Sequence, residues 1–106
     1  MELTRQIARQ KGLLKKSIIL AEDLDGFNSI GQCVFYECIN LTEITIPEFI
    51  ESIGVYAFYR CNSLTKLLIP DSVNSIEHCA FKECINLDSI KISNSVNNIS
   101  SEILSG

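Results

Sequence analysis

The sequence predicts a mostly β solenoid with a short helical cap, built from repeats that stack through a parallel sheet. Three observations support this fold class. Apolar and cysteine positions recur every 23 residues, each repeat contains a short stretch with period-2 alternation, and proline follows that stretch in two of the repeats. Seven columns recur in register over three copies, which chance does not explain. The columns begin at Phe35, Cys38, Leu41, Ile44, Ile46, Ile50 and Ile53.

Three repeats are expected to fill the centre of the chain, over residues 31–99. Residues 1–30 should form an N-terminal cap that combines an amphipathic helix with a degenerate first repeat, and residues 100–106 a short C-terminal cap. One repeat cannot bury its own apolar columns, and about three is the minimum for a stable array. The caps are therefore expected to matter for stability.

The N-terminal segment carries apolar residues on one helical face and basic residues on another, which predicts a short amphipathic helix over residues 2–16. Gly12 weakens the middle of this helix by about 1 kcal/mol relative to alanine. After it, Ile18 and Leu20 are expected to fill the strand columns of the degenerate repeat. The helix is either a cap with solvated charges or a basic arm that binds a partner or a membrane surface. The arm residues would be Arg5, Arg9 and Lys16.

Within each repeat, the pattern Leu-x-x-Ile-x-Ile alternates as a short strand does when one face is buried. Pro47 and Pro70 follow the strand and end its pairing, because proline has no N–H to donate. The second half of the repeat turns the chain back and is expected to place a phenylalanine in the interior of the coil. Each repeat should therefore form one complete coil.

The string A-F-x-x-C-x-x-L-x-x-I-x-I-P-x-x-V-x-x-I resembles the BspA-type (family 5) leucine-rich repeat over about residues 27–99. The resemblance implies a right-handed leucine-rich-repeat solenoid used for protein–protein contact, often in adhesion at microbial surfaces. It implies neither a catalytic site nor a cofactor. No secretory signal is evident, so a cytoplasmic location is expected, and the resemblance leaves the cell surface open if the chain is a fragment.

Composition and charge exclude several classes of protein. The chain has 106 residues, 46% of them apolar, and a formal net charge of −4, which fits one globular domain. Residues 1–16 carry five basic side chains against one acidic, whereas the rest carries four basic against twelve acidic. An acidic body argues against broad nucleic-acid binding. The longest purely apolar run, residues 18–21, is far too short for a membrane span of roughly 18 residues or more.

Catalysis and metal binding are not expected. His78 is the one histidine, and it aligns with turn positions of the other repeats. Cys38, Cys61 and Cys84 share one column and are expected to be free, buried thiols, because parallel side chains in register seldom reach the disulfide dihedral. Cys33 and Cys79 lie two coils apart, about 10 Å, so the cysteines cannot converge on one zinc ion.

Two surfaces carry the functional prediction. The first is the outward face of the sheet, where Leu68 is an apolar side chain among polar ones, either an interface centre or an incidental exposed leucine. Its candidate residues are Glu43, Thr45, Lys66, Leu68, Ser89 and Lys91. The second is a ridge after each phenylalanine, where tyrosines either anchor a partner or pack on one another. Its candidate residues are Tyr36, Tyr59, Arg60 and Lys82.

The sequence therefore predicts a non-catalytic protein-binding module without cofactors, an adaptor or an inhibitor that occludes a partner protein. A fragment of a surface adhesin, and a nucleic-acid or membrane-surface binder acting through the basic arm, are the alternatives. The C-terminal end of the sheet is expected to be open, and an open edge invites pairing with a second copy. A homodimer through that end is therefore left open.

Overall fold

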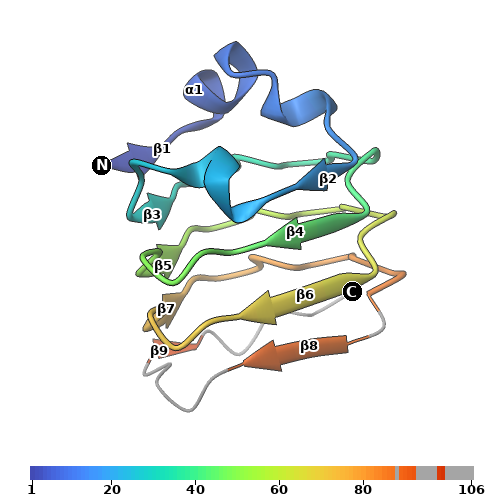
Figure 1. Ribbon diagram of the computed structural model, residues 1–106. Helices are drawn as coiled ribbons and strands as arrows, with labels where there is room; N and C mark the ends of the chain where they lie inside the picture. Colours follow the sequence, from blue (N-terminus) through green and yellow to red (C-terminus); the bar gives the residue numbers. More distant parts are fainter. Residues whose placement is uncertain (88, 93–97, 100–106) are drawn as a thin grey trace.

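The computed structural model describes residues 1–87, 89–92 and 98–99. In this part of the chain, stacked coils lie beneath an N-terminal helix (Figure 1). Each coil adds one strand to each of two parallel sheets, ordered β1-β3-β5-β7-β9 and β2-β4-β6-β8. The elements are β1 (Glu2–Leu3), α1 (Arg5–Gln10), η1 (Leu13–Lys15), β2 (Ile18–Ile19), η2 (Ala21–Leu24), β3 (Ser29–Ile30), β4 (Glu43–Thr45), β5 (Ser52–Ile53), β6 (Lys66–Ile69), β7 (Ser75–Ile76), β8 (Ser89–Ile92) and β9 (Asn98–Ile99).

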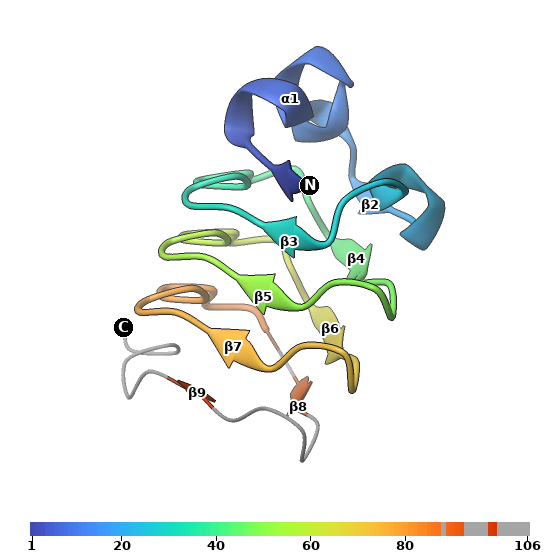
Figure 2. The same ribbon diagram turned by 90° about the vertical axis from the view of Figure 1, so that its left-hand side faces the viewer.

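The two sheets occupy different sides of the stack, joined by turns that lie above one another (Figure 2). In one sheet, Ile44 of β4 pairs with Leu67 of β6, which pairs with Ile90 of β8. In the other, β5 pairs with β7 through Ile53 and Ile76. Both registers keep the 23-residue interval, so the predicted parallel solenoid of stacked repeats is confirmed.

The core is a set of side-chain stacks that run along the solenoid. Phe35 and Phe58 stack with ring centroids 5.2 Å apart and an interplanar angle of 17°. Phe58 and Phe81 repeat this contact at 5.1 Å and 13°. All three rings are fully buried or nearly so. Offset stacking of this kind adds to the free energy that burial itself supplies.

The turn around the phenylalanine of each coil, residues 32–37 in the first, contains two non-glycine residues with left-handed backbone conformation. The first is Cys33, Tyr56 or Cys79, with φ of 57° to 58°. The second lies four residues later and has φ of 55° to 59°, as in Glu37. A side chain at such a φ costs about 1–2 kcal/mol, which the stacked coils compensate by hydrogen bonding the ridge backbone from one coil to the next.

The N-terminal helix is shorter than the predicted segment 2–16. Strand β1 takes residues 2 and 3 into a sheet, so Leu3 is buried as a strand residue rather than on a helical face. The Thr4 hydroxyl then accepts the Ile7 N–H at 3.2 Å and caps α1. Gly12 has φ of 78°, which a continuing α-helix cannot contain, and η1 follows it.

The inward residues of β2 were predicted one position out of phase. Ile19, not Ile18 or Leu20, pairs with the core residue Ile44 and is fully buried. Ile18 and Leu20 are each 48% exposed. Because successive strand residues point to opposite faces, a shift of one residue exchanges the buried and exposed sets. The predicted C-terminal cap over residues 100–106, with its open edge, lies outside the described residues.

Candidate functional site

The outward surface of β2, β4 and β6 is the main candidate site, here called the sheet face. Its six side chains point away from the core and are all exposed. They are Ile18, Glu43, Thr45, Lys66 and Leu68 on the strands, together with Leu20, which directly follows β2. Leu68 is 59% exposed. The structure therefore brings the four predicted residues of these strands together, and it adds two that the sequence prediction placed inside.

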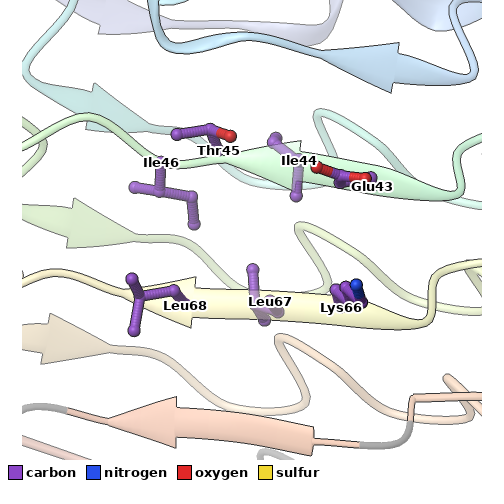
Figure 3. Close-up of a pocket in the computed structure, with 7 residues that line it drawn as sticks. All are labelled: Glu43, Ile44, Thr45, Ile46, Lys66, Leu67 and Leu68. Atoms are coloured by element: carbon purple, nitrogen blue, oxygen red, sulfur yellow. The ribbon is translucent and has the colours of Figure 1, made fainter.

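The rows of the sheet face follow from strand register. Glu43 lies opposite Lys66, and Thr45 lies opposite Leu68. Ile18 precedes Glu43 in the first row. Figure 3 shows the charged pair at one end of the face and Thr45 with Leu68 at the other.

The remaining two predicted residues, Ser89 and Lys91, lie on β8, where they pair with Lys66 and Leu68. They continue the two rows of the sheet face at the level of the backbone. This placement extends the candidate surface by one strand beyond β6.

A groove of about 360 Å³ lies on the sheet face between β4 and β6. Glu43 and Lys66 lie at one end of the groove and Thr45 and Leu68 at the other (Figure 3), whereas the lining residues Ile44, Ile46 and Leu67 are at most 4% exposed. The lining residues are Glu43, Ile44, Thr45, Ile46, Lys66, Leu67 and Leu68. A groove of this composition suits an apolar side chain of a partner that carries polar groups beside it.

Glu43 and Lys66 carry opposite charges at directly paired positions of neighbouring strands. Such cross-strand pairs attract one another, yet neither residue forms an ion pair or a side-chain hydrogen bond within the part of the chain that the structure describes. Both charged groups are therefore available to a partner.

The ridge is a cluster of the three tyrosines. Tyr36 and Tyr59 have ring centroids 5.0 Å apart, and Tyr56 meets Tyr59 edge-on at 5.2 Å. Arg60 lies over the Tyr59 ring, 5.5 Å from its centroid. The tyrosines thus pack on one another, as one of the two predicted alternatives has it, and each stays half-buried rather than fully exposed.

Arg60 links the charges of three coils along the ridge. Its Nε donates to Glu83 at 2.9 Å, and its Nη1 approaches Glu37 at 3.5 Å. The hydrogen bond from Arg60 lowers the pKa of the Glu83 carboxyl below its usual range, and the same hydrogen bond raises that of Arg60. Lys82, the fourth ridge candidate, is half-buried. Its backbone carbonyl accepts a hydrogen bond from the backbone N–H of Arg60 at 3.0 Å.

The candidate basic arm is divided by the fold. Arg5 is half-buried, and its Nη1 donates to the carbonyl oxygens of Cys33, Val34 and Tyr36 at 3.0, 3.2 and 3.1 Å. Lys16 pairs with Asp23 at 3.5 Å. Arg9 is exposed on α1. Of the three arm residues, it is the one whose side chain makes no hydrogen bond or ion pair among the described residues.

The hydrogen bonds of Arg5 replace the backbone hydrogen bonds that join the ridges of neighbouring coils. One repeat further on, the carbonyls of Ala57 and Tyr59 accept the backbone N–H groups of Phe35 and Glu37, each at 2.7 Å. These carbonyls lie 23 residues after two of those that Arg5 contacts. The guanidinium therefore supplies the donors that a preceding coil would supply, and it caps the ridge.

The cysteines serve the core and the turns. The Sγ of Cys61 donates to the Phe35 carbonyl at 3.2 Å, and the Sγ of Cys84 donates to the Phe58 carbonyl at 3.0 Å. Burial raises the pKa of the Cys38 thiol, which keeps it protonated at neutral pH. All five cysteines are free thiols in the structure, and of the three predicted to be buried, Cys38 and Cys61 are, whereas Cys84 is half-buried.

No metal centre is evident in the described part of the chain. No three His, Cys, Asp or Glu side chains there gather as a metal-binding group. His78 is exposed and packs edge-on against Tyr56 at 6.4 Å. The described region also lacks a helix with the length and apolar character that crossing a membrane requires.

Sequence reasoning missed Ile18 and Leu20 as members of the sheet face. The repeat period gives no guide there, because the segment before β3 departs from the 23-residue interval. The sequence did contain a signal, the apolar run Ile18-Ile19-Leu20. Because side chains alternate along a strand, either Ile19 alone or both Ile18 and Leu20 must point into the core.

Comparison with known proteins agrees with the fold. Residues 14–106 match the family model described as BspA type Leucine rich repeat region (6 copies). The T. pallidum leucine-rich repeat protein TpLRR is similar in structure, with a TM-score of 0.74 and 28% identity over 80% of this chain and 41% of that one. A leucine-rich repeat protein from Bacteroides ovatus is similar with a TM-score of 0.64 and 27% identity, over 73% of this chain and 22% of that one.

No curated protein matches this chain. The chain spans less than half the length of either similar solved structure. Proteins built from leucine-rich repeats are generally non-enzymatic, and such repeats typically form protein-interaction modules. The predicted family is confirmed by a match over most of the sequence and by the repeat register: this chain belongs to the BspA-type leucine-rich repeat family.

Proposed function

We propose that this chain is a non-catalytic protein-binding module, an adaptor or an inhibitor that occludes a partner protein, and that it binds through the sheet face. One observation supports the choice of surface above all. Three of the large apolar side chains left exposed lie at this face: Ile18 and Leu68 on its strands, at 48% and 59% exposure, and Leu20 directly after β2, at 48%.

The arrangement of the sheet face has the anatomy of an interface. Apolar groups lie beside the groove, and the charges of Glu43 and Lys66 lie at one end of it. Interfaces concentrate their binding energy in a few central residues, and the contacts around these residues exclude water. The backbone beneath is held in a parallel sheet, so a partner meets a surface that loses little conformational entropy on binding.

The ridge is the second candidate contact surface. Tyrosine and arginine are enriched at protein interfaces, and Tyr36, Tyr59, Arg60 and Lys82 follow one another along the coils. Their mutual packing and the ion pairs of Arg60 already supply a structural role. The sheet face, whose charged and apolar groups have no such role, is the stronger candidate.

Two alternatives are kept because each has a supporting observation. The chain spans 41% of TpLRR, which fits a fragment of a larger surface adhesin. Arg9 is exposed on the cap, which fits binding of a nucleic acid or a membrane surface. Binding of that second kind would weaken steeply between about 50 and 200 mM salt, whereas binding at the sheet face would respond mildly.

The test is capture of a partner with a photo-crosslinking amino acid placed at position 68. The same amino acid at position 39 is the control, because Ile39 is 60% exposed but lies in a turn away from the sheet. A protein from the native host that crosslinks at position 68 and not at position 39 would support the proposal. The capture should also disappear in E43K or K66E, because both charges border the groove.

Equal capture at both positions, or capture at position 39 without capture at position 68, would remove the sheet face as the binding surface. Circular dichroism of every variant should match the parent chain, because the changed side chains are exposed and outside the core. A variant that loses its fold is excluded from the comparison.

A further inference from the structure

We infer that a second copy of this chain occupies the sheet face, as a two-fold symmetric dimer in which each copy covers the other's binding surface. This inference rests on the proposed function, because it names an occupant of the same face. It also supplies a regulation: self-association and the binding of another protein exclude each other.

The charges of the sheet face carry this inference. Glu43 and Lys66 occupy paired positions on β4 and β6, and neither has an ion-pair partner within the described part of its own chain. A two-fold axis parallel to the strands and midway between β4 and β6 places β4 of one copy over β6 of the other. Glu43 of each copy then faces Lys66 of the other, so the dimer contains two such charge pairs.

The same axis matches the apolar half of the face. Thr45 and Leu68 are paired positions on the same two strands, so the axis places Leu68 of each copy over Thr45 of the other. Leu68 is 59% exposed and projects beside the groove, which it helps to line (Figure 3). The two Leu68–Thr45 contacts are then identical by symmetry, which is what an isologous interface requires.

The spacing of packed sheets allows these contacts. Sheets that pack face to face lie about 10 Å apart, a distance that extended glutamate and lysine side chains from opposite sheets bridge between them. The sheet face as defined above has six side chains per copy, far fewer than the roughly 20–30 residues a side of a standard interface. A weak, concentration-dependent dimer is therefore expected.

The experiment is sedimentation equilibrium of the purified chain from about 10 μM to 1 mM, a range that covers weak association. The parent chain should increase in average mass with concentration. E43K and K66E should each weaken association by about tenfold or more, because a single change alters two symmetry-related contacts. Mixing the two variants pairs an all-basic face with an all-acidic one, so the mixture should associate more tightly than either variant alone.

The double exchange E43K/K66E should restore association to near the parent value, since the symmetric pairing is regained with the charges exchanged. The matched control is E51K, a charge reversal at an exposed residue just before β5 in the other sheet, and it should behave as the parent does. A chain that stays monomeric at the highest concentration overturns the inference. So does a mixture of E43K and K66E that associates no better than its components.

These outcomes separate the inference from the proposed function. A monomeric chain that still crosslinks a different host protein at position 68 would refute the second copy and leave the proposed function standing. A chain that dimerises as described but captures nothing else at position 68, even at concentrations where it is monomeric, would support the inference and refute the adaptor or inhibitor role.

Discussion

Replacing Arg5 with methionine tests whether the N-terminal segment is a structural cap or a free basic arm. Methionine keeps most of the aliphatic length of arginine but removes the guanidinium that donates to the carbonyls of Cys33, Val34 and Tyr36. The carbonyls of Val34 and Tyr36 have no other hydrogen-bond donor among the described contacts. The loss of these two hydrogen bonds is therefore the main cost of the substitution.

The expected loss of stability is about 2–3 kcal/mol. A hydrogen bond to a charged group contributes about 1.5–3 kcal/mol to stability, and two carbonyls lose their donor. Water reaches part of this site, because Arg5 is half-buried, so the total falls below the sum of two such bonds. For a domain of about 100 residues, 1 kcal/mol corresponds to a change in Tm of about 4–8 °C, which gives a decrease of roughly 8–24 °C.

Thermal unfolding followed by circular dichroism, together with urea titration, measures this loss. Arg9→Met is the matched control, since Arg9 is exposed on the same helix, and its effect should stay within about 0.5 kcal/mol. Arg5→Lys should fall between the two, because one ammonium keeps the charge but not the planar donor geometry. If Arg5→Met and Arg9→Met lower stability equally, Arg5 does not cap the ridge and the basic-arm interpretation gains.

The other predictions concern the core, the turns and the ridge charges. Phe58→Ala should lower the free energy of unfolding by about 3–5 kcal/mol, because Phe58 stacks against a ring on each side, and chemical denaturation that shows little loss would contradict its place in the core. Cys33→Gly should raise stability by about 1 kcal/mol, because glycine adopts the left-handed φ of 58° without the cost that a side chain imposes, and a lower Tm would show that the Cys33 side chain contributes more than the strain. Glu83 should titrate below the usual glutamate range in NMR, and Arg60→Met should raise its pKa toward that range. Since the folded-state pKa of Glu83 is lowered, its contribution to stability is present above the unfolded pKa of about 4.3 and is lost as the pH falls through the folded value. A parent chain and an Arg60→Met variant with the same Glu83 titration would refute this pairing.

Family and fold followed from the sequence because the repeat is a geometric constraint. Residues 23 apart must occupy the same place in successive coils, so Phe35, Phe58 and Phe81 form one buried stack wherever the array begins. The outward positions of β4 and β6 followed in the same way, since alternation within a strand fixes the face of Leu68 once Leu67 is buried.

The N-terminal region was less predictable because no earlier copy fixes its register. The segment before β2 fits a helical face as well as it fits a strand followed by a helix, and local pattern alone favoured the longer helix over residues 2–16. Pairing of β1 with β3 decided the matter, and it joins residues 27 positions apart. Local reasoning from residues 2–16 does not reach that partner.

The sequence by itself determined that this chain is a stack of 23-residue coils with buried thiols, phenylalanine stacks and a polar sheet surface. The tertiary structure alone decided that Ile18 and Leu20 join the sheet face and that Arg5 replaces the donors of a preceding coil. The physical reason is the same in both cases. Periodicity specifies contacts between equivalent residues, whereas a cap contacts the first coil with residues that have no equivalent, and only the folded chain brings those residues together.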